Sequence, residues 1–367
     1  MLVIGAKRLF TTGLPFFMLA AACVCTRSPD DKNQTKPTVD SEITDSSTGF
    51  SLNEALAKED LLVFTSQPHP FGSPRNTFVA DHLISRMGDI PTVKQEFSAQ
   101  VPNPAAMSDT GGPMAMTLER VGHNVITTGA LKPDADCIVL FGSHFDSKDI
   151  EGLTYVGAND SGSSSVALLQ ILAYFHENRE KIAGDCDIGG IWFDGEEAVL
   201  PDWNDGLFKH PAKIQDNTYG SRHFVSNLSN CTRIEKPLKC MPEQYGGKAV
   251  VALVLLDMIG SPDIKISRDT NSSPSLLRAL ESGATALGIS DMLSKNMTAI
   301  EDDHIPFRKA GIAAIDIIDF NNISYWHAAG DDLDKISYKS IGLASRLAIF
   351  TALSATRNPK VFAETSE

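Results

Sequence analysis

The chain has 367 residues, 42% hydrophobic and 21% charged, which suits one large globular domain and is too short for several. Its formal charge of −14 at pH 7 argues against nucleic acid as a partner, because binding phosphates takes clustered Lys and Arg side chains. The acidity otherwise predicts solubility and no particular fold.

The first residues have the pattern of an export signal. Lys7 and Arg8 precede a mainly apolar run that ends at Ala22, and this run is too short to span a bilayer. Two outcomes stay open, which are plain cleavage after Ala22 or a lipid on Cys23, as in bacterial lipoproteins. We therefore predict a signal peptide over residues 1–22 and an exported protein, periplasmic or at the cell surface. It would touch the membrane only through such a lipid.

Composition changes after the signal. Residues 23–48 are rich in Ser, Thr, Asp, Lys and Pro, so we predict a flexible tether, followed by a single domain over residues 49–367. An even number of cysteines in that domain of an exported chain predicts two disulfides, with Cys231–Cys240 the easier pairing and free thiols the alternative. These cysteines are Cys137, Cys186, Cys231 and Cys240.

From Leu52 onward, segments of helical period alternate with short apolar runs. The helical segments are 52–66, 76–87, 161–180 and 273–287. Exposed strands are predicted at 92–100 and 117–128. Four further runs, rich in Val, Ile and Leu, lack alternation and read as strands buried on both faces, at 137–143, 188–193, 249–256 and 312–318. This order predicts an α/β fold with a mostly parallel, twisted central sheet and helices on both faces.

Five residues of metal-binding type follow these strands or lie in the loops between them. They are His144, Asp160, Glu197, Asp257 and His327. Ligands of parallel α/β sheets bind beyond the carboxyl ends of the strands, so we expect one shared site. Glu196 precedes Glu197, and adjacent side chains of an extended segment point to opposite sides. One carboxylate can therefore bind a metal while the other moves protons, as a hydrolytic or acyl-transfer zinc centre requires.

Each motif also has a simpler interpretation. In His144-Phe-Asp146 the two polar side chains share one side, so one can face a metal while the other orients a ligand, but an isolated motif of this kind is usually chance. Asp160 precedes Ser-Gly-Ser-Ser at a predicted helix start and could be a helix cap. The adjacent glutamates could be a solvated turn, and His327 beside Trp326 could be structural. The chain has no G-x-S-x-G elbow and no phosphate-binding loop.

Taken together, several segments resemble the zinc aminopeptidase superfamily and, within it, the glutaminyl-peptide cyclotransferases, the animal-type glutaminyl cyclases. The segments are GSHFDS, VGANDSG, FDGEEA, NTYGSRH, LLDMIG, EDDHIPF and YWH, and the resemblance runs from about Leu52 to about Phe350. It implies a zinc aminopeptidase-like α/β/α sandwich. It also implies a single zinc ion held by Asp160, Glu197 and His327.

The resemblance further assigns roles to the residues around that ion. Glu196 would be the general base and acid, and Asp302 and Asp257 would join it in an acidic hydrogen-bond network. His144 and Asp146 would lie beside the zinc or serve a second site. The substrate pocket would be lined by Trp203, Trp326 and Glu301.

Four features depart from the animal pattern. Trp203 lies one residue farther from Glu196, and the loop over residues 202–217 is longer. Asp316 and Asn322 stand where the animal enzymes have a pocket His and Phe. These changes leave the zinc chemistry intact and leave the substrate preference open.

The implied reaction is attack of the α-amine of an N-terminal glutamine on its own side-chain amide carbon. It releases ammonia and leaves pyroglutamate, so the expected partners are peptides or proteins with N-terminal Gln, and we expect a monomer. A two-zinc aminopeptidase, with His144 and Asp257 holding the second ion, stays open, although Asp302 stands where aminopeptidases usually have Ser or Thr. An inactive, peptide-binding surface lipoprotein is the third hypothesis.

Overall fold

The computed structural model describes residues 49–107, 115–127 and 131–363. The predicted signal peptide, the tether and Cys23 lie outside the described residues. Within the described ranges, no helix is both long enough and apolar enough to cross a membrane.

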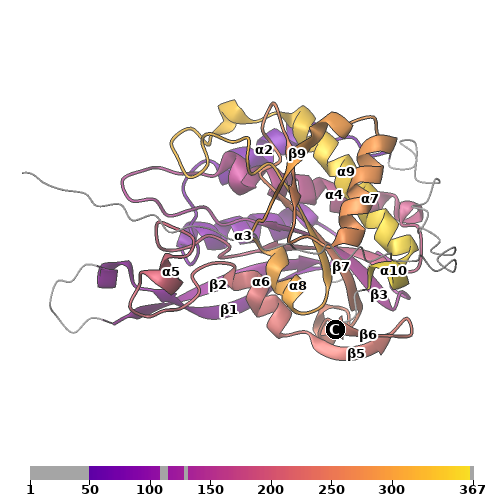
Figure 1. Ribbon diagram of the computed structural model, residues 1–367, viewed down its shortest axis with the longest axis horizontal. Helices are drawn as coiled ribbons and strands as arrows, with labels where there is room; N and C mark the ends of the chain where they lie inside the picture. The colour runs from indigo at the N-terminus through magenta and orange to yellow at the C-terminus, as the bar shows by residue number, and fades with distance from the viewer. Residues whose placement is uncertain (1–48, 108–114, 128–130, 364–367) are drawn as a thin grey trace, which may run out of the picture. The chain divides into compact units, whose positions relative to one another are not determined.

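Eight strands form the central sheet (Figure 1). Their order is β1-β2-β4-β3-β7-β6-β5, and β10 pairs with the later part of β7. A separate two-stranded sheet joins β8 and β9. The bounds are β1 (Thr92–Pro102), β2 (Thr117–Thr127), β3 (Cys137–His144), β4 (Asp187–Phe193), β5 (Ser229–Arg233), β6 (Lys236–Cys240), β7 (Ala249–Asp257), β8 (Ile266–Asp269), β9 (Leu293–Thr298) and β10 (Ala313–Ile318).

The centre of the sheet is parallel and its flanks are antiparallel. Strands β4, β3, β7 and β10 run in one direction. Antiparallel pairing joins β1 to β2, β2 to β4, β6 to β7 and β5 to β6. The predicted α/β sheet with a parallel core is thus confirmed, and the sheet as a whole is mixed. The four central strands are the ones predicted from their uninterrupted apolar runs.

Both faces of the central strands are buried. Alternate residues of β3 lie in different apolar clusters, with Val139 and Phe141 on one face and Ile138 and Leu140 on the other. The first face packs against α2 (Glu54–Phe64), α3 (Pro74–Met87), α4 (Ser164–Glu177), α7 (Pro274–Ala286) and α9 (Tyr338–Arg357). The second packs against α6 (Tyr219–Ser226) and α8 (His304–Lys309). The short helices α5 (Asp205–Phe208) and α10 (Pro359–Phe362) complete the set.

Some elements differ from the sequence prediction. The helix expected over 161–180 is α4, and it follows a π-helical turn (Ala158–Ser163) in which Asp160 and Ser161 have non-helical dihedral angles. Helix α9, which lies beside α4 and α7 in Figure 1, was not expected. Neither was the β5–β6 hairpin, whose residues are mostly polar and at least partly exposed.

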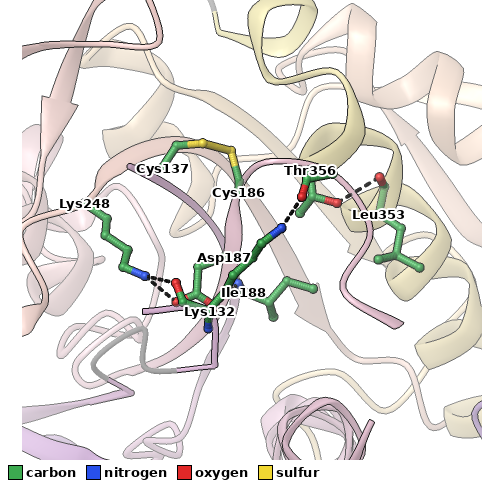
Figure 2. Close-up of a disulfide and its surroundings, with 9 residues drawn as sticks. Lys132, Cys137, Cys186, Asp187, Ile188, Lys248, Leu353 and Thr356 are labelled. Atoms are coloured by element: carbon green, nitrogen blue, oxygen red, sulfur yellow. Dashed lines mark hydrogen bonds and ion pairs between the residues drawn. A yellow bond between two sulfur atoms is a disulfide. The ribbon is translucent and has the colours of Figure 1, made fainter. Parts of the chain in front are cut away.

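Two disulfides are present, as predicted. Cys231–Cys240 links the two strands of the β5–β6 hairpin, and Cys137–Cys186 joins the start of β3 to the residue before β4. Figure 2 shows the second bond near a buried ion pair, in which Lys248 Nζ lies 2.7 Å from Asp187 Oδ2. The amino ends of β3 and β4 are therefore tied together covalently. Two disulfides also fit export to an oxidising compartment.

Candidate metal and catalytic site

The five residues of metal-binding type all lie at one edge of the central sheet. His144 is the last residue of β3 and Asp257 the last of β7, and Glu197 follows β4 closely. Asp160 lies in the turn before α4, and His327 lies in the loop after β10. Because β3, β4 and β7 are parallel, their carboxyl ends meet at this edge.

These residues form two groups that share one member. His144, Asp160 and Asp257 make the first group, and Asp160, Glu197 and His327 make the second. In each group, one potential ligand atom per residue lies within 4.8 Å of the others. His144 Nε2 is 3.2 Å from Asp160 Oδ1, whereas His327 Nε2 is 3.4 Å from Asp160 Oδ2. Asp160 therefore turns a different oxygen toward each group.

The donor set fits a metal ion. In the described part of the chain, the buried atoms His144 Nε2 and Glu197 Oε2 make no hydrogen bond. Buried polar atoms nearly always have a partner, so each unpaired atom calls for one that the protein chain does not supply. Histidine nitrogen and carboxylate oxygen are the ligands that zinc takes at catalytic sites. The second group is the ligand set predicted for a single zinc, and the first offers a set for another ion.

Asp146 orients the glutamate pair. Its carboxylate accepts hydrogen bonds from the backbone N–H of Glu196 at 3.0 Å and of Glu197 at 3.3 Å. His144 Nδ1 lies 3.1 Å from the backbone carbonyl of Asp146, to which it donates, and this contact leaves Nε2 facing Asp160 and Asp257. Outer contacts of this kind fix the direction of metal ligands.

Asp160 is held by two residues that the sequence analysis did not single out. The Tyr155 hydroxyl lies 3.0 Å from Asp160 Oδ2 and 3.1 Å from Asp331 Oδ2, so its one proton is shared between the two carboxylates. Asp331 also accepts the backbone N–H of Asn159 and of Asp160. The Asp160 carboxylate thus faces both histidines and Tyr155 and does not cap the helix. The signal for Asp331 was the acidic pair that follows YWHAAG in the sequence.

Lys148 is a further residue that was missed. Its buried Nζ donates to the backbone carbonyls of Ala198 at 2.6 Å and Leu200 at 3.0 Å, and it lies 3.8 Å from Glu197 Oε2. It therefore fixes the start of the long loop after the glutamate pair. Nothing in the local sequence pattern distinguishes this lysine from a solvent-exposed one.

Glu196 is buried and belongs to neither ligand group. Its Oε2 lies 3.9 Å from His144 Nε2. Burial raises the pKa of Glu196 well above its usual value. The charge of His144 lowers this pKa, whereas the charges of Asp302 and Glu197 raise it further. Burial likewise raises the pKa of Asp302, and it raises that of Asp257 to about 7. The carboxyl groups are thus crowded enough to share protons, which suits a proton-transfer site.

A cavity of about 550 Å³ opens over these groups. Glu196, Asp257 and Asp302 line it together with the second ligand group. Two tryptophans form part of its wall: Trp203 Nε1 donates to Glu301 Oε2 at 3.3 Å, and Trp326 stacks on His327 with ring centroids 4.2 Å apart. The long loop supplies Trp203 and Asn204, so it forms part of the cavity wall.

Asp316 and Asn322, the positions at which the sequence departs from the animal pattern, have different surroundings. Asn322 does not line the cavity, and its side-chain amide donates to the backbone carbonyl of Asp263 at 2.8 Å. Phe320, two residues earlier, lines the cavity and packs edge-on against Trp326. Asp316 is fully buried beneath the cavity, and burial together with Asp302 raises its pKa well above the usual value. Phe320 and Trp326 thus form an aromatic part of the cavity wall.

Comparison with known proteins agrees with this geometry. The sequence profile of Peptidase family M28 matches residues 124–352. A Bos taurus protein named glutaminyl-peptide cyclotransferase is 26% identical over 317 residues, which cover 80% of this chain and 79% of that protein. A Drosophila melanogaster protein of the same name is 25% identical over 237 residues, which span 59% of this chain and 60% of that protein.

Solved structures give the same picture. The glutaminyl cyclase of an Acidobacteriales bacterium is 27% identical with a TM-score of 0.62, and the match covers 83% of this chain and 96% of that one. A Zn-dependent exopeptidase from Parabacteroides distasonis, 20% identical with a TM-score of 0.61, shares the fold over 84% of this chain and 99% of its own. The predicted resemblance is confirmed: the chain belongs to Peptidase family M28 and is similar to its glutaminyl cyclases.

Proposed function

We propose that the protein is a glutaminyl-peptide cyclotransferase, which converts the N-terminal glutamine of peptides or proteins to pyroglutamate and releases ammonia. The position of Glu196 carries this proposal. It is a buried carboxyl group that lines the same cavity as Asp160, Glu197 and His327 but stands outside that ligand group. A proton-shuttling carboxylate beside a metal-binding set is what cyclisation of an amide requires.

Asp160, Glu197 and His327 would hold a zinc ion, which when bound supplies a Lewis acid for the side-chain amide oxygen. Glu196 accepts a proton from the attacking α-amine and delivers it to the leaving nitrogen. Its raised pKa helps it to hold the proton between the two halves of this exchange. Asp257 and Asp302 line the same cavity, and the charge of Asp302 helps to raise the pKa of Glu196.

The cavity walls have a separate task. Nucleophile and electrophile belong to the same glutamine, so the protein must hold the conformer in which they approach each other. Trp203, Trp326 and Phe320 provide an apolar wall for the side-chain methylenes, and Glu301 places a carboxylate where an α-ammonium group would enter. No water molecule is needed as nucleophile.

The test is to incubate the purified, zinc-loaded protein with a Gln-initiated peptide and, separately, with a Leu-initiated peptide of the same remaining sequence. Ammonia release and a pyroglutamyl product are expected from the first, with no free amino acid from either. Release of leucine without cyclisation would contradict the proposal. Absence of any reaction with both peptides would favour the inactive peptide-binding hypothesis.

A two-metal aminopeptidase is the second candidate function, and one observation favours it. His144, Asp160 and Asp257 form a ligand group of their own, all buried. In that case Glu196 would activate a water molecule, and two zinc ions per chain would be bound. Metal analysis of active protein separates the two functions, because the cyclotransferase is expected to be fully active with one ion.

The setting in which the protein acts follows from the same proposal. Its substrates would be peptides or proteins outside the cytoplasm, and the two disulfides fit that location. A periplasmic or cell-surface location and a monomeric state are further predictions, and both plain cleavage after Ala22 and a lipid on Cys23 stay open.

A further inference from the structure

Trp203 is a wall shared by three adjacent cavities. It lines the central cavity of about 550 Å³, a second cavity of about 370 Å³ and a third of about 500 Å³. Leu207, Phe208 and Ile305 line the second cavity. Asp149, Glu151 and Asp202 line the third. Both other cavities are therefore candidate paths for a peptide whose first residue occupies the central cavity.

We propose that the second cavity binds the residues that follow the N-terminal glutamine of the substrate and selects an apolar side chain there. The inference rests on the proposed function and names the class of peptide that the site accepts.

Continuity with the central cavity is the first argument. Trp203, Glu301 and Asp302 line both cavities, and the hydrogen bond from Trp203 Nε1 to Glu301 Oε2 joins two of these shared residues. An extended peptide advances about 3.5 Å per residue, so the first or second residue after glutamine reaches beyond this shared wall. A volume of about 370 Å³ is within the range that holds a small ligand.

The apolar surface of the second cavity is the second argument. Phe208 has 73% of its surface exposed, which is the largest exposed fraction of any large hydrophobic residue in the described ranges. Leu207, beside it on α5, is 39% exposed. Exposed apolar side chains grouped at a cavity mark a binding surface, because covering them with an apolar ligand group removes them from water.

Charge alone does not distinguish the two exits, because each cavity is lined by carboxylates and one lysine. Glu301, Asp302 and Lys309 line the second cavity, and Asp149, Glu151, Asp202 and Lys148 line the third. The exposed apolar side chains of Leu207 and Phe208 line the second cavity, so an apolar side chain after the glutamine matches it.

The experiment compares two tripeptides, Gln-Phe-Ala and Gln-Ala-Ala, by their kcat/KM for ammonia release from the zinc-loaded, full-length protein. Wild-type protein should prefer the first. Removing about 40 Å² of apolar contact changes an equilibrium by roughly fivefold, so the Phe/Ala ratio should fall about fivefold in Phe208→Ser. The matched control is Phe78→Ser, since Phe78 on α3 is also exposed, at 51%, and lines none of the three cavities.

A third substrate, glutamine amide, has no residue beyond the first and tests the proposed function separately. Lack of turnover with all three substrates would contradict the cyclotransferase proposal alone. In that case, calorimetry on Glu196→Gln protein tests the second cavity. The ratio of the Kd values of the two tripeptides then takes the place of the ratio of their kcat/KM values. An equal preference in wild-type and Phe208→Ser protein, or an equal loss in Phe78→Ser, would overturn the inference. A preference for Gln-Lys-Ala over Gln-Phe-Ala would also overturn it, because the site would then not select an apolar side chain.

Discussion

Buried charges are paired at the amino ends of the central strands and crowded together, partly unpaired, at the carboxyl ends. At the amino ends of β3 and β4, the Asp187 carboxylate pairs with Lys248 and accepts the backbone N–H groups of Lys132 and Ile188. A disulfide closes the same end (Figure 2). At the carboxyl ends, buried carboxyl groups crowd together, and His144 Nε2, Glu197 Oε2 and Asp302 Oδ2 make no hydrogen bond within the described ranges.

This difference separates stability from function along the strands. Satisfied charges and a covalent link contribute to stability, whereas unsatisfied buried charges cost stability and are retained where they bind or react. Substitutions at the amino ends should therefore change the stability of the fold with little change in rate. Substitutions at the carboxyl ends should do the reverse.

The largest effect is expected at the carboxyl ends, from Glu196→Gln. The amide cannot accept the proton of the attacking amine, so kcat should fall about 10³-fold. Zinc content and thermal stability should be retained, because a buried charge is replaced by a neutral group of the same shape. Metal analysis and a melting curve serve as controls, and a variant that keeps its rate would remove Glu196 from the proposed role.

Opening the disulfide at the amino ends should give the next largest effect. The double variant Cys137→Ser, Cys186→Ser loses a cross-link that closes a chain segment with a sequence separation of 49 residues. Stability should fall by about 4 kcal/mol, lowering Tm by roughly 10 °C. Below Tm, kcat should be close to that of the wild type.

The matched control is Cys231→Ser, Cys240→Ser, because its sequence separation is 9 and the expected loss is smaller. A larger loss from the hairpin pair than from the sheet pair would show that the amino end of the sheet does not depend on its cross-link.

Lys248→Met breaks the ion pair and leaves Asp187 buried without its cation. Stability should fall by about 3 kcal/mol, since the remaining charge is uncompensated. Chemical unfolding measures this loss. The double variant Lys248→Met, Asp187→Leu should recover part of it, which would distinguish an unpaired charge from simple loss of packing.

The smallest effect is a pH dependence of the metal-free protein. Burial raises the pKa of Asp257 and of Asp331 to about 7, so each group contributes stability below its unfolded pKa near 4 and loses it as pH rises through 7. Tm of chelator-treated protein should therefore fall by a few degrees between pH 5 and pH 8. Asp331→Asn should reduce the slope. An identical slope in zinc-loaded protein would contradict this account, because a bound cation stabilises the ionised carboxylates.

The central fold could be predicted because its strands have a simple physical signature. Runs such as 137–143 and 249–256 are apolar without alternation, as strands buried on both faces require. The β5–β6 hairpin lacks that signature, since Ser229–Arg233 is mostly exposed and polar. Its disulfide is local and was predicted, but its pairing with β7 is not a local property of the chain.

The residues of the site also fall into those that the sequence predicts and those that it does not. Histidines and carboxylates that follow apolar strands are visible in a sequence because their chemistry is unusual at those places. Lys148 and Tyr155 were not found, since each acts through contacts with segments far away in the chain. Phe320 was not found because its contact with Trp326 depends on the conformation of the loop between them. A lysine or an aromatic residue in a loop gives no sign of whether it will turn inward.

The position of Asp160 between the two ligand groups bears on how related proteins diverge. One of its oxygens faces His144 and the other faces His327, so a single carboxylate serves both ligand groups. If the proposed function holds, gain or loss of a second ion at this shared carboxylate would not require a change of ligand residues. Peptide cleavage and ring closure would then be neighbouring outcomes of one set of side chains.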